Sequence, residues 1–400
     1  MRTMKLGKRL IGAGHPCYII AEISCNHNGN FSEARALIEE SARTGVDAVK
    51  LQTYTPQTIT RNFKTTAKGT IWDKTDLFSL YSQAYTPWEW HAELKKVADD
   101  CNIDLFSSPF DETAVDHLEQ NDVPVYKVSS FEIVDTNLLR KIAKTGKPVI
   151  MSNGMTDYLE LSEAVGVLRD AGVKNLALLH CNSGYPAEFA EANLKTIPAI
   201  AALFDCPVGL SDHTLFADTK NYTDPLAHIT PLEAVRFGAS IIEFHIMSNR
   251  AESRALMQQN KGGFDWPFSR EPHEVKKMVD MIRHFEKTGE IAYTTELERT
   301  IAAKTHGHVC FEPTEKELGS RQFRPSLWVV ADIKKGETIH FAGGYEGNVD
   351  SIRPGGGLAI RFADFIDGRT ATRDLKAGEP LSWDMFDSAE TVSVAQKRKA

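Results

Sequence analysis

Eight short apolar segments alternate with eight segments of helical periodicity over the first 290 residues, and this alternation restricts the fold more than any other feature. The predicted strands are residues 17–24, 48–54, 104–110, 125–130, 148–154, 176–182, 208–213 and 241–247. The predicted helices are residues 32–45, 87–102, 112–120, 136–145, 158–171, 192–204, 231–238 and 271–289. Strands that alternate with helices form parallel sheets, either closed as a (β/α)8 barrel or open as a doubly wound sheet.

Polar side chains stand at the carboxyl ends of nearly all of these strands. They are Glu22, Lys50, Gln52, Ser107, Ser108, Lys127, Ser130, Glu132, Ser152, Asn153, Asn182, Ser183, Ser211, His213, Glu243 and His245. In a barrel these ends meet at one mouth, where active sites of that fold lie, whereas in an open sheet they would be spread along an edge. We therefore predict an α/β fold, a (β/α)8 TIM barrel. No GxGxxG or GxxxxGK[ST] motif follows a strand, so a dinucleotide or P-loop site has no support.

Two of the predicted strands end in a histidine, His213 and His245. Because side chains alternate along a strand, Ser211 shares a face with His213, and Glu243 shares a face with His245. Two neutral imidazoles that converge from two strands can hold one divalent metal and leave coordination positions open to substrate. The alternative is a pair of unrelated core histidines, and these two segments alone leave both interpretations open.

The pattern changes after the predicted barrel domain, residues 1–290. Residues 291–322 are polar and weakly periodic and are predicted to be a linker, and residues 323–386 are predicted to be a small β-rich domain with Gly-rich turns. That domain contains a near-repeat, Asp332-Ile-Lys-Lys-Gly-Glu337 and Asp374-Leu-Lys-Ala-Gly-Glu379, with Arg353-Pro-Gly-Gly-Gly357 between the copies. We expect residues 387–400 to be a mobile tail. Residues 55–86 are too long for an ordinary connection, and we expect them to cover a site.

Charge and cysteine content exclude several classes of partner. The net charge is −8 and no long basic run occurs before the last few residues, so no nucleic acid partner is expected. No apolar run reaches the length of a membrane span and no signal-peptide pattern is present, so no membrane partner is expected. The six cysteines are scattered without a CxxC pair, which is typical of reduced thiols in a cytoplasmic protein.

Motifs in these segments resemble those of the N-acetylneuraminate (sialic acid) synthase family, which includes pseudaminic and legionaminic acid synthases. They are Ile20-Ala-Glu-Ile23, Asn26-His-Asn-Gly29, Ala48-Val-Lys-Leu-Gln52, Ser107-Ser-Pro-Phe110, Tyr126-Lys-Val-Ser-Ser-Phe-Glu132, Leu179-His-Cys-Asn-Ser-Gly-Tyr-Pro186 and Gly209-Leu-Ser-Asp-His-Thr214. The near-repeat and the Arg-Pro-Gly-Gly-Gly segment resemble the antifreeze-like (SAF) domain of that family. The motifs follow the family order over residues 17–382, roughly, so the resemblance spans both predicted domains.

The resemblance implies a reaction and its partners. Phosphoenolpyruvate condenses with the aldehyde of an open-chain, ManNAc-like N-acylhexosamine, and the products are a nine-carbon 2-keto-3-deoxy acid and phosphate. A divalent metal (Mn²⁺, Mg²⁺ or Co²⁺) on His213 and His245 polarises the aldehyde as a Lewis acid. The family also implies a domain-swapped homodimer, in which each SAF domain caps the barrel of its neighbour.

The resemblance further implies a role for each matching residue. Catalytic positions are Glu22, Glu132 and Lys50. Phosphoenolpyruvate-binding positions are Lys127 and again Lys50, with Ser108, Ser130, Ser152, Ser183 and Ser211 suited to its phosphate oxygens, and Asn182 is a further substrate-binding position. Positions that contact the sugar are Gln52, Tyr185, Asp265 and Arg324. A lysine within an apolar strand is rarely buried without an anionic partner, which favours a functional Lys127 over a surface lysine. The serines are also suited to capping helices. Either glutamate could pair with a neighbouring lysine, and Tyr185 could be a packing aromatic.

The chain departs from the family pattern at three places. Phe244 replaces a lysine, the 215–229 connection is longer, and Pro325 stands where a second arginine is common. These departures affect the acceptor sugar more than the chemistry. Three alternatives are a metal-dependent barrel hydrolase, a synthase of the same chemistry with a different aldose acceptor, and a non-catalytic sugar- or protein-binding chain.

Overall fold

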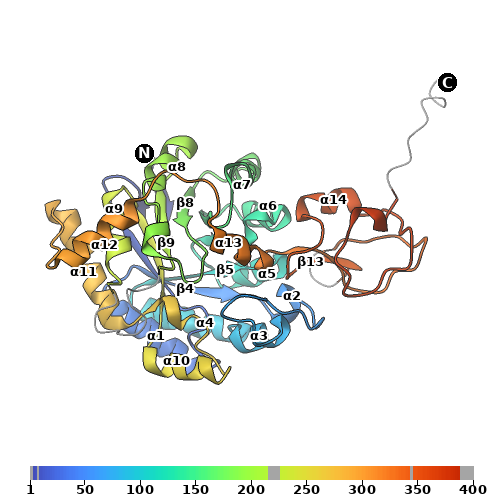
Figure 1. The fold of residues 1–400 in the computed structure, drawn as a ribbon, viewed down its shortest axis with the longest axis horizontal. Helices are drawn as coiled ribbons and strands as arrows, with labels where there is room; N and C mark the ends of the chain where they lie inside the picture. The colour runs from blue at the N-terminus through green and yellow to red at the C-terminus, as the bar shows by residue number, and fades with distance from the viewer. Residues whose placement is uncertain (1–2, 7–8, 215–225, 343–345, 388–400) are drawn as a thin grey trace.

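The computed structural model describes residues 3–6, 9–214, 226–342 and 346–387. Figure 1 shows a large α/β part with the C-terminal segment, coloured red, at one side of it. The predicted mobile tail lies outside the described residues except for Asp387, and most of the 215–229 connection lies outside them too.

Eight parallel strands close into a barrel, which confirms the predicted fold. They are β3 (Tyr18–Glu22), β4 (Ala48–Thr53), β5 (Asp104–Pro109), β6 (Tyr126–Val128), β7 (Val149–Ser152), β8 (Leu176–Cys181), β9 (Val208–Asp212) and β10 (Ile241–Ile246). Each strand pairs with the next along the chain, and β10 pairs with both β9 and β3, which closes the ring. A short strand, β11 (Ser269–Arg270), pairs in parallel with the carboxyl end of β10.

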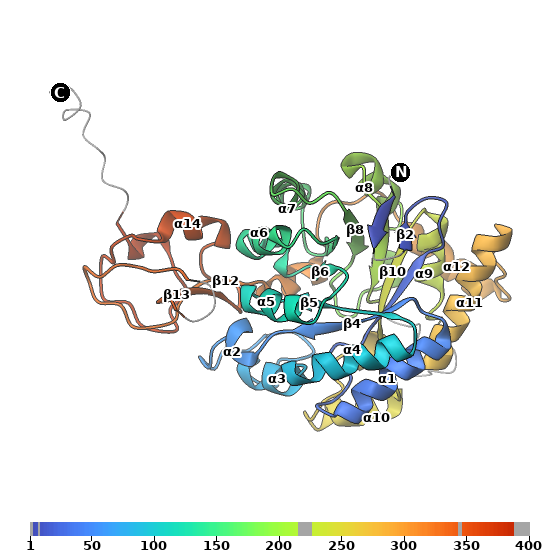
Figure 2. The same cartoon turned by 180° about the vertical axis from the view of Figure 1, so that it is seen from behind.

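Helices surround the barrel close to the predicted positions (Figures 1 and 2). They are α1 (Phe31–Thr44), α4 (His91–Asp100), α5 (Glu112–Gln120), α6 (Thr136–Lys144), α7 (Tyr158–Asp170), α8 (Thr196–Phe204), α9 (Ile229–Arg236) and α11 (Pro272–Thr288). Polar caps fix several of their first turns: the Asp135 carboxylate accepts the backbone N–H of Leu138 at 3.0 Å, for example. One further helix, α10 (Arg250–Gln258), was not predicted.

The register of the strands determines which polar side chains meet inside the barrel. Glu22 is the register partner of Lys50 on one side and of His245 on the other. Ser211 is the register partner of Glu243. Residues in register on parallel strands point to the same side of the sheet. The five side chains therefore gather at the carboxyl ends of neighbouring strands.

A hairpin that was not predicted precedes the barrel. Its strands are β1 (Met4–Leu6) and β2 (Arg9–Ile11), and Met4 and Leu6 are buried. Arg9 forms an ion pair with Asp47, which directly precedes β4, at 2.6 Å. The hairpin thus lies against the amino ends of the strands, opposite the mouth. Two three-residue strands are too short to show a clear alternation, which is why the sequence did not reveal them.

The long polar stretch 55–86 contains two helices, α2 (Pro56–Ile59) and α3 (Leu77–Ala84). Its apolar side chains form a cluster of their own with residues of the mouth: Tyr54, Ile59, Leu77, Leu80, Tyr81, Phe264 and Phe323 are buried together. The expectation that this stretch covers a site therefore agrees with its packing.

Residues 291–322 are more ordered than a simple linker. They contain α12 (Glu296–His306) and α13 (Glu315–Ser320), each of which begins with a Thr-x-x-Glu capping box. Glu298 pairs with His228 at 3.0 Å, and the carboxylate of Glu317 accepts the backbone N–H groups of Met155 and Ser183, each at 2.9 Å. The predicted linker is thus helical in part, because its local capping signals outweigh its polar composition. The segment is packed against the barrel.

The C-terminal segment is β-rich, as predicted, with β12 (Ser326–Val329) antiparallel to β13 (Val349–Ile352). The aspartate of each copy of the near-repeat accepts a hydrogen bond from a backbone N–H of the other copy. Asp332 accepts the N–H of Ala377 at 3.0 Å, and Asp374 accepts the N–H of Lys335 at 2.9 Å. The turns therefore form one small unit around a core that includes Leu327, Ile333 and Leu375.

This unit, residues 323–386, docks on the mouth of the barrel beside α5 and α6 (Figure 2). Arg61 pairs with Asp350 at 2.9 Å, and the Ser351 hydroxyl donates to the Asp135 carboxylate at 3.2 Å. Burial raises the pKa of Asp350 to about 6 and that of Asp135 to about 7. Two buried carboxyl groups with raised pKa values, Asp350 and Asp135, thus lie where the SAF unit meets the barrel.

Candidate active site

A cavity of about 900 Å³, which includes its opening to solvent, lies at the mouth of the barrel. Most of the predicted site residues line it: Lys50, Gln52, Ser108, Lys127, Ser130, Ser152, Tyr185, Ser211, His213, His245 and Asp265. The strand ends supply its polar groups. Trp72, Tyr81, Phe131 and Phe323, which come from connecting segments, supply an aromatic wall.

Two buried lysines and two buried glutamates form the charged centre of the site. Lys50 pairs with Glu22, its register partner, and its Nζ lies 3.7 Å from Oε1 of Glu243. Lys127 Nζ lies 3.5 Å from the same oxygen. Burial would raise the pKa of Glu243, but Lys127 and Lys50 lower it to about 2, so this carboxylate is ionised at neutral pH.

The surroundings shift the pKa values of the two lysines in opposite directions. Burial would lower the pKa of Lys50, but the carboxylates of Glu22 and Glu243 raise it above its usual value. Burial lowers the pKa of Lys127, which has fewer anionic neighbours. Lys127 is 2% exposed and lines the cavity, so an anionic ligand there would stabilise its charged form.

Small hydroxyls surround the lysines. Ser108 accepts a hydrogen bond from Lys50 at 3.2 Å, and Ser211 donates to Glu243 at 3.0 Å. The hydroxyl of Ser130 accepts the N–H of Gly154 at 3.0 Å. The buried hydroxyl of Ser152 has no hydrogen-bond partner among the described residues. A buried polar group without a partner is costly, so Ser152 is suited to donate to a bound anion.

His213 and His245 both line the cavity, and their ring centroids are 5.2 Å apart. His213 Nδ1 lies 3.1 Å from the carbonyl of Asn182, a geometry that suits donation from Nδ1 and leaves Nε2 as a potential ligand. His245 Nδ1 lies 3.2 Å from an Asp265 oxygen. Burial lowers the pKa of His213, which keeps the ring neutral. The pair therefore fits a divalent metal better than it fits two unrelated core histidines.

Three of the four predicted sugar-contacting residues, Gln52, Tyr185 and Asp265, line the cavity, and hydrogen bonds through Ser24 connect two of them. Gln52 donates to the Ser24 hydroxyl at 3.0 Å, and Ser24 donates to Asp265 at 2.6 Å. The ring of Tyr185 lies 4.5 Å from His213 and stacks on Phe131 at 5.9 Å, centroid to centroid. This part of the cavity thus combines amide and carboxylate groups with flat aromatic surfaces.

Five predicted site residues do not line the cavity. Glu22 and Glu132 are buried behind it, paired with Lys50 and Arg353. The Asn182 amide bonds to the backbone at Gly184 and Glu191, and the N–H of Ser183 bonds to Glu317. Arg324 pairs with Glu160 at 2.8 Å on the outside of the barrel.

The sequence reasoning gave no role to several residues of the site, among them Glu243, Arg353 and Trp72. Glu243 holds both lysines, and its place two positions before His245 was the signal that could have identified it. Arg353 of the Arg-Pro-Gly-Gly-Gly segment lines the cavity, and so does Trp72 of the 55–86 stretch. No local pattern predicts where these two side chains lie.

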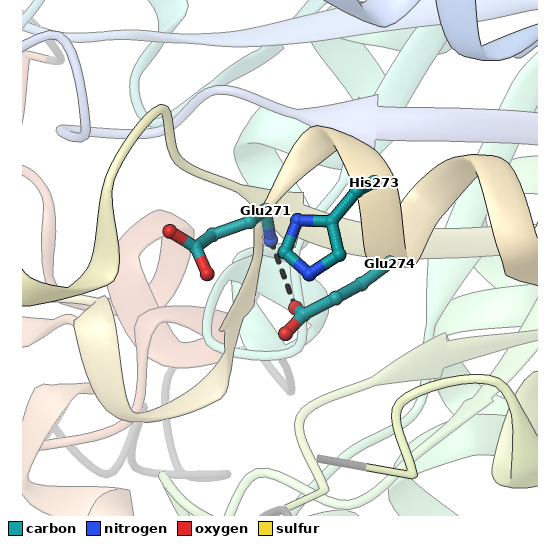
Figure 3. Close-up of side chains that lie close together, drawn as sticks. All are labelled: Glu271, His273 and Glu274. Carbon is teal, nitrogen blue, oxygen red and sulfur yellow. Dashed lines mark hydrogen bonds between the residues drawn. The ribbon is translucent and has the colours of Figure 1, made fainter. Parts of the chain in front are cut away.

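Glu271, His273 and Glu274 form another group of metal-binding residue types, at the start of α11 (Figure 3). The backbone N–H of Glu271 donates to Glu274 at 2.9 Å, as part of a helix cap. Arg250 binds both carboxylates, at 3.1 Å to Glu271 and 2.6 Å to Glu274. The carboxylates thus already have a cationic partner, and the group is explained without a metal.

Comparison with known proteins agrees with this geometry. A model of the NeuB family matches residues 37–291, and a model of the SAF domain matches residues 324–387. The chain belongs to the NeuB family. The resemblance to sialic acid synthases is thereby confirmed. The match to the NeuB model covers the strands that carry Lys50, Lys127, His213 and His245.

Relatives of this NeuB-family chain span nearly its whole length. It is 37% identical over 372 residues to the pseudaminic acid synthase of Helicobacter pylori, which covers 92% of this chain and 97% of that protein. It is 34% identical over 368 residues to the N,N'-diacetyllegionaminic acid synthase of Campylobacter jejuni, with 90% and 97% covered. The crystal structure of the Bacillus subtilis spore coat polysaccharide biosynthesis protein spsE has a TM-score of 0.75 and 29% identity, and covers 97% of this chain and 99% of that chain.

These matches identify the NeuB-family chain as an enzyme of the nonulosonic acid synthase type. A non-catalytic binding chain is thereby excluded. Among the described residues, no helix has both the length and the apolar character needed to cross a bilayer.

Proposed function

We propose that this NeuB-family enzyme condenses phosphoenolpyruvate with the aldehyde of an open-chain N-acylhexosamine. Carbon 3 of phosphoenolpyruvate bonds to the aldehyde carbon, water adds to carbon 2, and the bond from carbon 2 to the phosphate oxygen breaks. The products are phosphate and a nine-carbon 2-keto-3-deoxy acid. The buried Lys127 beside the histidine pair at one barrel mouth is the observation that carries this proposal.

Lys127, Lys50 and the hydroxyls around them would bind phosphoenolpyruvate. Its phosphate and carboxylate carry several negative charges, and the lysines supply cations in a site screened from water. The free hydroxyl of Ser152 offers a further donor. Ser108 and Ser130 accept their hydrogen bonds from Lys50 and Gly154, so their hydroxyl protons would be available to ligand oxygens, whereas Ser211 would exchange Glu243 for a ligand oxygen.

A divalent metal, Mn²⁺, Mg²⁺ or Co²⁺, would be held by His213 and His245 and would act there as a Lewis acid toward the aldehyde oxygen. The Asn182 carbonyl lies 3.1 Å from Nδ1 of His213 and the Asp265 carboxylate lies 3.2 Å from Nδ1 of His245, so each would help to orient one ring. Glu22 would hold Lys50 in place and, with Glu132, is our choice for orienting water or moving a proton during addition to carbon 2.

The acceptor would lie along Gln52, Asp265 and Tyr185. Gln52 and Asp265 can bind hydroxyl or amide groups, whereas the stacked rings of Tyr185 and Phe131 suit the methyl group of an acyl substituent. The names of the two synthases above support acylated amino sugars as the acceptor class. A different aldose acceptor for the same chemistry remains the second candidate.

We also propose that the enzyme works as a homodimer with the SAF unit as the cap. In this single chain the cap lies on its own barrel, through Phe323 and Arg353. The same contacts made between two chains would give the domain-swapped dimer.

One experiment tests the reaction. Phosphate release from phosphoenolpyruvate is followed with a panel of hexosamines that carry one or two N-acyl groups, with and without a chelator. We expect release that depends on both the acceptor and the metal, with a nine-carbon acid as product. Hydrolysis of a substrate without phosphoenolpyruvate would instead favour the barrel hydrolase.

A further inference from the structure

The side chain of Ser24 connects two of the predicted sugar-contacting residues inside the cavity. Ser24 is 3% exposed and lines the cavity just after β3. Its hydroxyl donates to Oδ2 of Asp265 at 2.6 Å and accepts a hydrogen bond from Nε2 of Gln52 at 3.0 Å. Because a carboxylate can only accept, the single hydroxyl proton is committed to Asp265, and a lone pair of the same oxygen holds the amide nitrogen of Gln52. One hydroxyl thus orients both groups.

The backbone of Ser24 has a conformation that glycine favours. Its φ is 49°, in the left-handed region, and it is the first central residue of a turn in which the N–H of Asn26 donates to the carbonyl of Ile23 at 3.0 Å. A side chain makes this conformation costly. The backbone N–H of Ser24 donates to Oε1 of Glu22 at 2.8 Å, and glycine would keep that contact without the strain. The serine is therefore explained by its hydroxyl and not by the turn.

The two groups that this hydroxyl holds offer a defined set of hydrogen bonds to a sugar. With its nitrogen toward Ser24, the Gln52 amide directs its carbonyl oxygen away from that hydroxyl. This carbonyl and the Asp265 carboxylate are both acceptors, so they suit neighbouring hydroxyl or amide N–H groups of the sugar. Oδ2 of Asp265 also lies 3.2 Å from Nδ1 of His245, so the same carboxylate connects the sugar side of the cavity with a proposed metal ligand.

We propose that Ser24 is a positioning residue for the acceptor sugar, and that its hydroxyl holds Gln52 and Asp265 in the arrangement that binds the sugar's hydrogen-bond donors. This inference rests on the proposed function and adds a residue to its acceptor side. Glu22 is held by the backbone N–H, which any residue at position 24 except proline retains, so binding of phosphoenolpyruvate should not depend on the hydroxyl. A purely structural role is the alternative, since a buried and strained residue can matter for stability alone.

Two substitutions separate these alternatives, because both remove the hydroxyl and they differ in strain. Ser24→Ala keeps a Cβ in the left-handed conformation, whereas Ser24→Gly removes it. A structural role predicts that activity follows stability, so the glycine variant would be less impaired. A positioning role predicts the same loss of acceptor binding in both. Asp122→Ala and Asp122→Gly are matched controls, because Asp122 also has a positive φ, of 48°, and its side chain is fully exposed outside the cavity.

All variants are compared with the parent as full-length enzymes. We expect both Ser24 variants to raise the acceptor KM about tenfold, the scale for losing a hydrogen bond to a charged group, and to leave the KM of phosphoenolpyruvate within about threefold of the parent value. Ser24→Gly should unfold about 2 °C or more above Ser24→Ala. The Asp122 pair should differ in unfolding temperature in the same direction, with neither KM changed.

Two measurements do not depend on turnover. The alditol made by reducing the most active acceptor of the panel has no aldehyde and cannot react, and calorimetry should show that both Ser24 variants bind it about tenfold more weakly than the parent does. Hydrogen exchange of residues 262–268, which include Asp265, should rise to the same extent in both Ser24 variants and stay unchanged in the Asp122 pair.

An acceptor KM and alditol affinity close to the parent values in both Ser24 variants would overturn the inference. So would an acceptor defect in Ser24→Ala that Ser24→Gly restores, or equal rises of both KM values. If Ser24→Ala fails to fold, Ser24→Gly carries the comparison with the parent. A parent enzyme that releases no phosphate with any acceptor would overturn the proposed function instead, and hydrogen exchange would then decide whether Ser24 holds Asp265: unchanged exchange rejects that contact.

Discussion

Glu243 and Lys127 stand on β10 and β6, and Oε1 of the glutamate lies 3.5 Å from Nζ of the lysine inside the cavity. The same oxygen lies 3.7 Å from Lys50 and accepts the hydroxyl of Ser211 at 3.0 Å. One oxygen of Glu243 therefore lies near the ammonium groups of both buried lysines, Lys50 and Lys127. The proposed phosphoenolpyruvate would therefore meet lysines that are already oriented, and it would share them with Glu243.

Replacement of Lys127 by methionine should weaken phosphoenolpyruvate binding. We expect the KM to rise by an amount equivalent to about 2–5 kcal/mol, the range for removing one partner of a buried charge pair. Initial rates against phosphoenolpyruvate and acceptor measure this, with Lys141→Met on the surface of α6 as control. Normal saturation by phosphoenolpyruvate with an altered acceptor KM would show that the lysine serves the other substrate.

Removal of either histidine should abolish metal-stimulated turnover. His213→Ala and His245→Ala each remove one of two proposed ligands, so we expect loss of Mn²⁺ binding in a titration and loss of activity, with an intact fold. His273→Ala alters the group at the start of α11 and should change neither. Activity that survives exhaustive chelation would refute the metal assignment. An effect of His273→Ala on Mn²⁺ binding would instead place the metal site at the start of α11.

Gly154→Ala should displace the hydroxyls of Ser130, a proposed phosphoenolpyruvate ligand, and of Ser183 without unfolding the barrel. An added Cβ would lie 2.8 Å from the hydroxyl of Ser130 and would also clash with that of Ser183. We expect a higher KM for phosphoenolpyruvate. Gly166→Ala in α7 meets nothing within 4 Å and should be neutral or stabilise the helix by up to about 1 kcal/mol. Equal KM values in the two variants would contradict the placement of these hydroxyls.

The folded enzyme should lose stability as pH rises. Burial, with smaller contributions from Glu112 and Glu132, raises the pKa of Asp135 to about 7. A carboxyl whose pKa is raised in the folded state stabilises that state at low pH, and this contribution is lost as pH rises through the folded value. Thermal unfolding between pH 5 and pH 8 should show the loss. Asp135→Asn keeps the helix cap and should reduce the pH dependence of the unfolding temperature. An unchanged pH dependence in this variant would exclude Asp135 as the titrating group.

Mixing two inactive variants should show which barrel the SAF unit caps. Arg353→Ala removes the cap's contribution and Lys127→Met removes the barrel's. In a domain-swapped dimer, exchanged subunits form one intact site and activity rises above either parent. If each cap stays on its own barrel, as in the single chain, no mixed site is intact. Exchange itself is followed by mass spectrometry, so that absence of rescue after confirmed exchange rejects the swap.

Much of the barrel and its polar interior could be predicted because both depend on local patterns. Apolar runs give the strands, and alternation along them places Lys50, Ser211 and His245 on the inner side of the mouth. The capping boxes at Thr295 and Thr314 were equally local, yet they were missed because the surrounding composition is polar.

The remaining site residues could not be found in this way. Arg353 and Trp72 lie in irregular segments, and their positions follow from how those segments pack. Arg324 illustrates the same limit: it was the best candidate for a sugar-contacting arginine in a segment that departs from the family pattern at Pro325, and its guanidinium pairs with Glu160 on α7. A motif identifies a residue type at a chain position, and tertiary packing decides what the side chain meets.

The Glu317 carboxylate has a consequence for recombination between relatives. It accepts N–H groups from the loops after β7 and β8, so α13 belongs structurally to the barrel that it follows. Chimeras that exchange SAF units should therefore be joined after Arg321, just beyond α13. A junction at residue 290 would give each barrel a foreign α13 against its own loops, and the crossover itself would then impair the active site.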